Sequence, residues 1–144
     1  MPRAVIDTTV LVSAFLRPHE GGASFDLLHL AAAGAFELVL SDDILEETAR
    51  VLLTRPHLRR RYQYPDAAVV IYCKGLTEIA TVVISDPPSV DVVRDPEDNM
   101  IVACAAIAKA EYLVSRDKDL LALGEYSGIR MLTPEAFLSV LRAA

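Results

Sequence analysis

Short runs of apolar, β-branched residues alternate along the chain with longer stretches in which apolar positions recur at helical spacing. The short runs are typical of buried strands, and the longer stretches begin at hydroxyl, acidic or proline residues that favour helix starts. We expect strands at residues 3–7, 36–40, 77–85, 111–115 and 129–132. We expect helices at residues 10–16, 24–33, 41–53, 66–76, 95–109 and 134–141, with a helical turn at 117–123.

Strands that alternate with helices in this way are typical of a parallel sheet covered on both faces, which is a three-layer α/β domain. The 144 residues match one domain of the usual size of roughly 100–200 residues, and no repeat or linker divides them. A hydrophobic content of 53% with 24% charged residues favours a folded chain over a disordered one. We therefore expect residues 1–144 to form a single α/β domain.

Three segments depart from simple alternation. Pro56 predicts a break after the third helix, followed by a basic connector at residues 57–61. Proline and glycine residues predict loops at 18–22 and 85–91. In the helix at 24–33, Phe25, Leu28 and Ala32 are expected to share one face.

Net charge and cysteine usage narrow the function classes. A net charge of −6 argues against a general basic binder of nucleic acid, although it allows a local basic patch. Cys73 and Cys104 form no CxxC pair, so we expect small buried hydrophobes rather than a zinc knuckle or a redox dithiol. The chain begins without a basic-then-apolar leader, and its longest apolar run is far shorter than the ~20 residues of a membrane span. We expect a cytoplasmic protein with no membrane contact.

Four acidic residues from distant segments are expected to converge. Asp7 ends the first strand and Asp117 lies just past the fourth, and ligands of open α/β sheets bind beyond the carboxyl ends of strands. Glu47 shares a helix side with apolar residues, and Asp98 lies in the first turn of an almost wholly apolar helix. Bare carboxylates in one crevice repel one another, and a divalent cation such as Mg²⁺ or Mn²⁺ cancels that cost. Such a site can activate water for displacement at phosphorus.

Each acid also has an alternative structural interpretation. Asp95 is a candidate helix cap, with Asp98 in a capping-box position, and Asp117 can cap the turn that follows it. Glu47 can pair with Arg50, although Glu46 has the i+4 spacing to that arginine. Thr8 or Thr9 can cap the first helix, which leaves Asp7 without an evident capping role.

Four segments together resemble the PIN-domain family, of the bacterial kind that serves as toxin in a toxin–antitoxin pair. They are residues 5–14 (VIDTTVLVSA), 41–52 (SDDILEETARVL), 95–99 (DPEDN) and 113–121 (LVSRDKDLL), in the family's order. The resemblance implies a Rossmann-like sheet with strand order 3-2-1-4-5 and a metal-dependent ribonuclease site. It also implies a homodimer and a cognate antitoxin protein as partner.

Carried over by position, the resemblance assigns the catalytic acids to Asp7, Glu47, Asp98 and Asp117. Asp7, Asp98 and Asp117 would bind the metal, and Asp95, Asp119, Ser115 and Thr9 would be auxiliary. Ser115 matches a hydroxyl position expected to hold a metal-bound water. Thr9 stands where the family commonly has Asn, and its hydroxyl can still donate a hydrogen bond to a carboxylate.

A basic patch precedes the fourth helix and lies beside Tyr62 and Tyr64. Arginines interleaved with aromatic residues can hold phosphates and stack on unpaired bases, although a solvated connector is the simpler interpretation. The patch consists of Arg55, Arg59, Arg60 and Arg61. The three histidines, His19, His29 and His57, lack the spacing of metal ligands.

The leading hypothesis is a Mg²⁺- or Mn²⁺-dependent endoribonuclease that cleaves single-stranded or looped RNA. One alternative is a catalytically weak PIN-fold module that acts by binding a protein partner, for which Thr9 is the sequence hint. A second alternative is a phosphatase with Asp7 as nucleophile, but the usual type of such enzymes needs a second Asp at position 9.

Overall fold

A six-stranded sheet forms the centre of the computed structural model, which describes residues 1–18, 22–84 and 94–143. The strand order is β3-β2-β1-β4-β6-β5, and every neighbouring pair is parallel except β5 and β6. The strands are β1 (Arg3–Ile6), β2 (Glu37–Ser41), β3 (Ala80–Val83), β4 (Tyr112–Val114), β5 (Glu125–Tyr126) and β6 (Ile129–Leu132). The expected order 3-2-1-4-5 is confirmed with β6 as its fifth strand, and the short antiparallel β5 is an addition at the edge.

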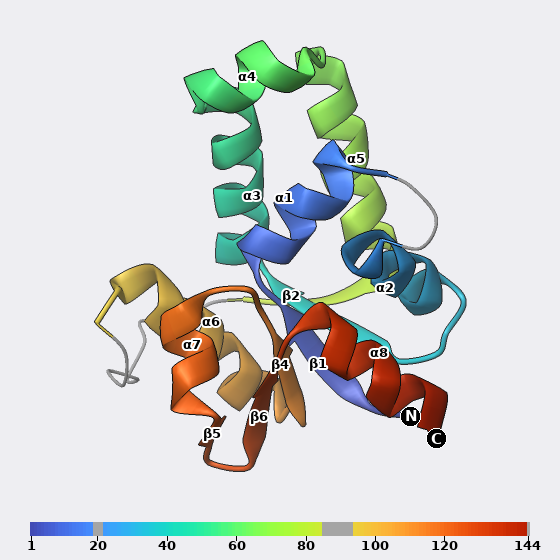
Figure 1. The fold of residues 1–144 in the computed structure, drawn as a ribbon, viewed down its shortest axis with the longest axis vertical. Helices are drawn as coiled ribbons and strands as arrows, with labels where there is room; N and C mark the ends of the chain where they lie inside the picture. Colours follow the sequence, from blue (N-terminus) through green and yellow to red (C-terminus); the bar gives the residue numbers. More distant parts are fainter. Residues whose placement is uncertain (19–21, 85–93, 144) are drawn as a thin grey trace.

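Helices cover both faces of the sheet (Figure 1). Helices α6 and α7 lie on one side, where α6 crosses β1, β2, β3 and β4, and α1, α2 and α8 lie on the other. The helices are α1 (Thr8–Leu16), α2 (Ala23–Ala32), α3 (Asp42–Thr54), α4 (Pro56–Tyr62), α5 (Asp66–Ile79), α6 (Pro96–Ala108), α7 (Lys118–Leu123) and α8 (Pro134–Ala143). The predicted three-layer α/β fold is therefore confirmed.

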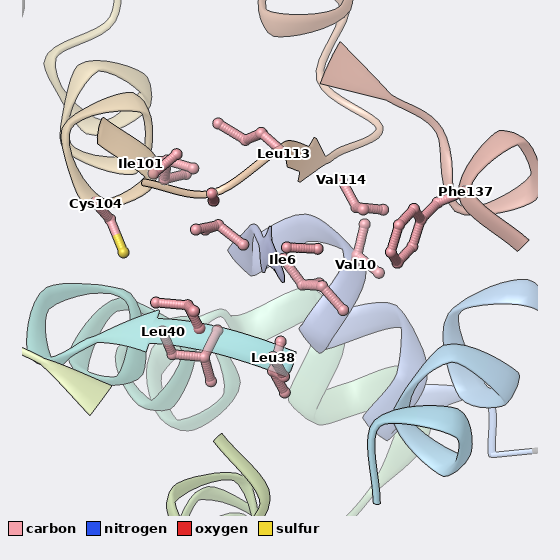
Figure 2. Close-up of a cluster of buried hydrophobic side chains, with 14 of the residues drawn as sticks. Ile6, Val10, Leu38, Leu40, Ile101, Cys104, Leu113, Val114 and Phe137 are labelled. Carbon is pink, nitrogen blue, oxygen red and sulfur yellow. The ribbon is translucent and has the colours of Figure 1, made fainter. Parts of the chain in front are cut away.

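Apolar side chains fill both spaces between sheet and helices. Figure 2 shows Ile101 and Cys104 of α6 on one side of this core, with Val10 and Phe137 on the other. Cys104 is buried among apolar residues, as predicted, whereas Cys73 of the helix at 66–79 is only half-buried, so that part of the prediction is wrong. Helix α6 is less enclosed than its composition suggests, because Ile107 near its end is 47% exposed.

Helices α3, α4 and α5 form an arch that rises beyond the sheet, with α4 joining the far ends of the other two (Figure 1). The connector expected at residues 57–61 is therefore wrong, because this segment is helical. Pro56 occupies the first turn of α4, where a missing backbone N–H costs no helical hydrogen bond. The expected third strand also begins too early, because Leu76 and Ile79 continue the helical spacing of α5 into the core.

Phe25, Leu28 and Ala32 share one side of α2, as predicted, and all three line a groove between α1, α2 and α5. The residues of α2 that the structure buries most deeply are Ser24, Leu27 and Ala31, one position before each of these. His19 and the expected loop at 85–91 lie outside the described residues.

Within the described ranges, no helix combines the length and the apolar character that crossing a membrane requires.

Candidate metal centre in an acidic cavity

Asp7 lies at the carboxyl end of β1 and is 1% exposed. Its side chain, rather than Thr8 or Thr9, caps α1 by accepting a hydrogen bond from the Val10 backbone N–H at 3.3 Å. The expectation of a threonine cap is therefore wrong, because the strand runs directly into the helix and leaves Asp7 at the N-cap. Burial raises the pKa of Asp7, and hydrogen bonds from Ser115, Thr9 and the backbone oppose that rise.

Two hydroxyl groups hold the Asp7 carboxylate from opposite sides. Thr9 donates to Oδ1 and Ser115 donates to Oδ2. The strand register explains the Ser115 contact, because Ile6 pairs with Val114 and the following residues emerge side by side. Ser115 Oγ also accepts the backbone N–H of Asp117 at 2.9 Å. Ser115, predicted to hold a metal-bound water, thus positions two acidic residues in this structure.

Asp117 caps α7 and lies close to two other carboxylates. Its Oδ1 accepts the backbone N–H groups of Asp119 at 2.9 Å and Leu120 at 3.2 Å. Carboxylate oxygens of Asp98, Asp117 and Asp119 all lie within 4.8 Å of one another. The capping interpretation is therefore correct, and it is compatible with a place in an acidic cluster.

Asp98 is the least compensated acid of this cluster. It lies in the first turn of α6 and is 8% exposed, and its Oδ2 is buried without a hydrogen-bond partner. The pKa of this carboxyl is raised to about 7, first by burial and then, in decreasing order, by the negative charges of Asp117, Asp95, Asp7 and Asp119. An orphaned buried carboxylate beside other carboxylates is the arrangement that a bound cation satisfies.

Asp95 begins α6, as predicted, and its Oδ1 accepts the Glu97 backbone N–H at 2.9 Å. Its exposed side chain also lines the cavity described below. In the expected capping box, the Asp98 side chain would accept a hydrogen bond in return. Asp98 Oδ2 accepts none, because it has no hydrogen-bond partner. That oxygen is left for another ligand.

Glu47 lies across from this cluster and is paired with Arg50. The closest contact, from Arg50 Nη2 to Glu47 Oε1, is 2.7 Å, and Arg50 also approaches Glu97 at 3.6 Å. Of the two partners that the sequence offered for Arg50, the structure therefore confirms Glu47, and the pairing with Glu46, which is exposed, is wrong. Glu47 is not part of the three-carboxylate group.

One open cavity of about 310 Å³ joins these groups. Its lining comes from five segments and includes Asp7, Glu47, Asp95, Asp98 and Asp117. The lining also includes an acid that sequence reasoning missed, Asp43, one helical turn before Glu47. The i, i+4 spacing of Asp43 and Glu47 could have predicted that both acids lie on the same side of the helix.

The predicted basic patch is divided by the structure. Arg55 and His57 line the cavity, so its wall carries both signs of charge. Arg59 is tied to Asp66 at 2.6 Å, and Arg60 and Arg61 are exposed on α4. His57 was set aside as a metal ligand, and no metal-ligand group in the described part of the chain includes it.

The donor set fits a hard divalent cation. Every candidate ligand is a carboxylate oxygen, and all-oxygen sites suit Mg²⁺ or Mn²⁺ rather than zinc or copper. Asp98, Asp117 and Asp119 already approach one another, and Asp7 is fixed beside them through Ser115. Three negative charges this close are costly without a cation.

The fold and its sequence have known relatives. VapBC2 from Rickettsia felis, solved bound to a promoter DNA fragment, matches with a TM-score of 0.61 at 10% identity, covering 90% of this chain and 96% of that one. PAE2754 from Pyrobaculum aerophilum matches at 0.59 and 17% identity, covering 99% and 91%. Mycobacterium tuberculosis VapC20, described as a Sarcin-Ricin loop cleaving toxin, matches at 0.56 and 17% identity, covering 88% and 98%.

The comparison with curated protein sequences found no match. The PIN-domain family model, in contrast, matches residues 3–119, which contain all four of the acids predicted from the sequence and most of the sheet. This chain therefore belongs to the PIN-domain family.

Proposed function

We propose that this protein is a metal-dependent endoribonuclease that cleaves single-stranded or looped RNA and is the toxin of a toxin–antitoxin pair. The observation that carries the proposal is the buried, unpartnered Oδ2 of Asp98 beside Asp117 and Asp119. An apolar or hydrogen-bonded group at that position would be cheaper for stability, so the charge is explained best by a ligand. Membership of the PIN-domain family supports nuclease chemistry at this cavity.

In this proposal, Asp7, Asp98 and Asp117 hold Mg²⁺ or Mn²⁺, and Asp119 and Asp95 lie beside them. A bound divalent cation would polarise the phosphodiester and make a coordinated water a better nucleophile. Thr9 and Ser115 keep the Asp7 carboxylate in one orientation, which is what positioning residues of a metal site do. Asp7 retains acceptor capacity, because an ionised carboxylate has about four lone-pair sites.

In this proposal, Glu47 acts on water rather than on the cation. It lies on the cavity wall outside the three-carboxylate group, and Arg50 holds both of its oxygens. We assign Glu47 Oε1 or Oε2 the role of accepting a hydrogen bond from the attacking water and orienting it. An open cavity admits an unstacked strand more readily than a duplex, which favours single-stranded or looped RNA.

The toxin assignment is supported by the neighbours in fold. One is a VapBC complex and another is described as a toxin that cleaves the Sarcin-Ricin loop. By that likeness, this chain would have a cognate antitoxin protein as partner, act in the cytoplasm and form a homodimer.

The phosphatase and binding-module hypotheses have less support than the nuclease hypothesis. The phosphatase hypothesis is disfavoured because Thr9 stands where the usual type of such enzymes needs a second Asp. The binding-module hypothesis rested on Thr9, whose hydroxyl reaches the Asp7 carboxylate and so supplies a hydrogen bond there. It remains the hypothesis that a negative nuclease assay would support.

The test is cleavage of a mixed single-stranded RNA pool by the wild-type protein with Mn²⁺, with EDTA, and by Asp98→Asn. We expect cleavage only in the first reaction. Glu46→Gln, an exposed acid on the same helix as Glu47, serves as a matched control and should cleave normally. A folded, metal-binding wild type that cleaves no RNA in the pool would reject the nuclease assignment in favour of the binding module.

A further inference from the structure

The cavity is acidic at one end and basic at another. The carboxylates come from the sheet edge and from α3 and α6, whereas Arg55 and His57 come from the start of the arch helix α4. An RNA strand carries a negative charge at every phosphate. Phosphates on either side of the one being cleaved would therefore be repelled by the acids and need cations along their path.

Helix α4 carries those cations on the side that faces the cavity. His57 and Leu58 line the cavity. Arg61 lies four positions after His57 and three after Leu58, so helical spacing puts it on the same side of α4. Arg55 and Arg61 are exposed, and within the described parts of the chain neither is paired with a carboxylate. The Arg61 guanidinium lies 5.4 Å from the centre of the Tyr62 ring, in a cation–π contact.

Arg59 of the same helix has a different role. It donates to Asp66 at 2.6 Å and to the Leu52 carbonyl, and its guanidinium lies over the Tyr64 ring at 4.8 Å. These contacts join α3, α4 and the start of α5, and they leave Arg59 occupied within the arch. The basic patch predicted as one unit thus separates into a structural arginine and free arginines.

We propose that Arg55 and Arg61, with His57 between them, form a track along α4 that binds the RNA phosphates flanking the cleavage site. This inference rests on the proposed ribonuclease function and adds the path by which the strand leaves the acidic cluster. It explains how a chain of net charge −6 holds a polyanion. The contacts are to phosphates, so the track contributes affinity and orientation without reading the base sequence.

The test is the double variant Arg55→Gln/Arg61→Gln against Lys74→Gln/Arg142→Gln, an equal charge change at exposed residues away from the cavity. Binding of a labelled single-stranded RNA in EDTA is measured by fluorescence anisotropy at several salt concentrations. We expect the track variant to lose affinity by about tenfold and its salt slope, log Kd against log salt, to fall by about 1.4. The control variant should match the wild type, and circular dichroism should show all three folded.

Cleavage kinetics with Mn²⁺ provide the second readout. The track variant should raise KM while kcat stays near the wild-type value, because the lost contacts act equally in the ground state and the transition state. A wild type that binds no RNA in EDTA, or a track variant that binds as tightly as the control, would overturn the inference and assign α4 to a protein contact. If RNA binding depends on the track but no cleavage occurs, the nuclease function is rejected while the proposed RNA-binding track is supported.

Discussion

Two buried carboxylates at the same end of the sheet differ in how far hydrogen bonds satisfy their oxygens. Asp7 has both oxygens satisfied, by Thr9, Ser115 and the α1 backbone. Asp98 is almost as buried, yet its Oδ2 has no partner and its closest charged neighbours are other acids. In both, burial is the main cause of a raised pKa. The difference teaches that hydrogen bonds within the protein already orient Asp7 for its proposed place at the metal, whereas Asp98 Oδ2 has no compensation until a ligand binds.

The largest expected effect follows from removing the unsatisfied charge. Asp98→Asn keeps the shape of the side chain but removes its negative charge and one ligand oxygen, so Mn²⁺-dependent cleavage should fall by at least about a hundredfold. Initial rates on single-stranded RNA measure this loss. Cleavage by Asp98→Asn within a few-fold of the wild type would contradict the contrast between the two acids.

Metal binding should stabilise the folded protein through the same residue. A ligand that binds only the folded state at about a hundred times its Kd adds about 2.7 kcal/mol. Thermal unfolding of the wild type with and without Mn²⁺ should therefore show a raised midpoint, and Asp98→Asn should lose most of that increase. An equal increase in both proteins would place the metal elsewhere.

The stability of the metal-free protein should depend on pH through Asp98. Its folded pKa of about 7 lies above the ordinary value of 3.8, so the folded state binds the proton more tightly than the unfolded state does. Stability is therefore lost as the pH rises between these two values. The raised pKa of Asp7 acts with the same sign.

Comparing Asp98→Asn with the wild type in EDTA isolates this contribution. The variant should have the higher thermal midpoint at pH 8, where the wild-type carboxyl is charged in the folded state. The difference should be far smaller at pH 4, close to the ordinary pKa of 3.8, where little of this stability has yet been lost. The asparagine carries no charge at either pH. A midpoint difference that is the same at both pH values would show that the charge of Asp98 is not what destabilises the site.

The smallest effects should come from the hydroxyls that satisfy Asp7. Ser115→Ala leaves Asp7 Oδ2 without its donor in a site that is 0% exposed, which should destabilise the fold by about 1–3 kcal/mol. Thr9→Ala should cost less, since Thr9 is exposed and water can take its place. Urea unfolding in EDTA measures both. Thr9→Asn, with the residue more common in the family, should retain cleavage, and its inactivation would show that Thr9 does more than hold Asp7.

The sequence determined the alternation of strands and helices and therefore a parallel sheet covered on both faces, and the resemblance to the PIN-domain family implied the order of the parallel strands. It also placed Asp7 and Asp117 at one sheet edge, because the carboxyl ends of parallel strands point the same way. Local capping chemistry was equally readable, as Ser41, Asp95 and Asp117 demonstrate by capping the helices that follow them. These features depend on neighbours along the chain, and such neighbours are visible in the sequence.

Other features were decided only by the tertiary structure. Arg50 approaches Glu97 of α6 as well as Glu47 of its own helix, and no sequence pattern linked α3 to the start of α6. The basic segment before α5 is a helix that lines the cavity rather than a connector, and only the fold separates Arg59 from Arg55 and Arg61. The unsatisfied oxygen of Asp98 likewise depends on which groups from distant segments come within reach. Charge and hydrogen-bond compensation act between spatial neighbours, and folding alone brings those neighbours together.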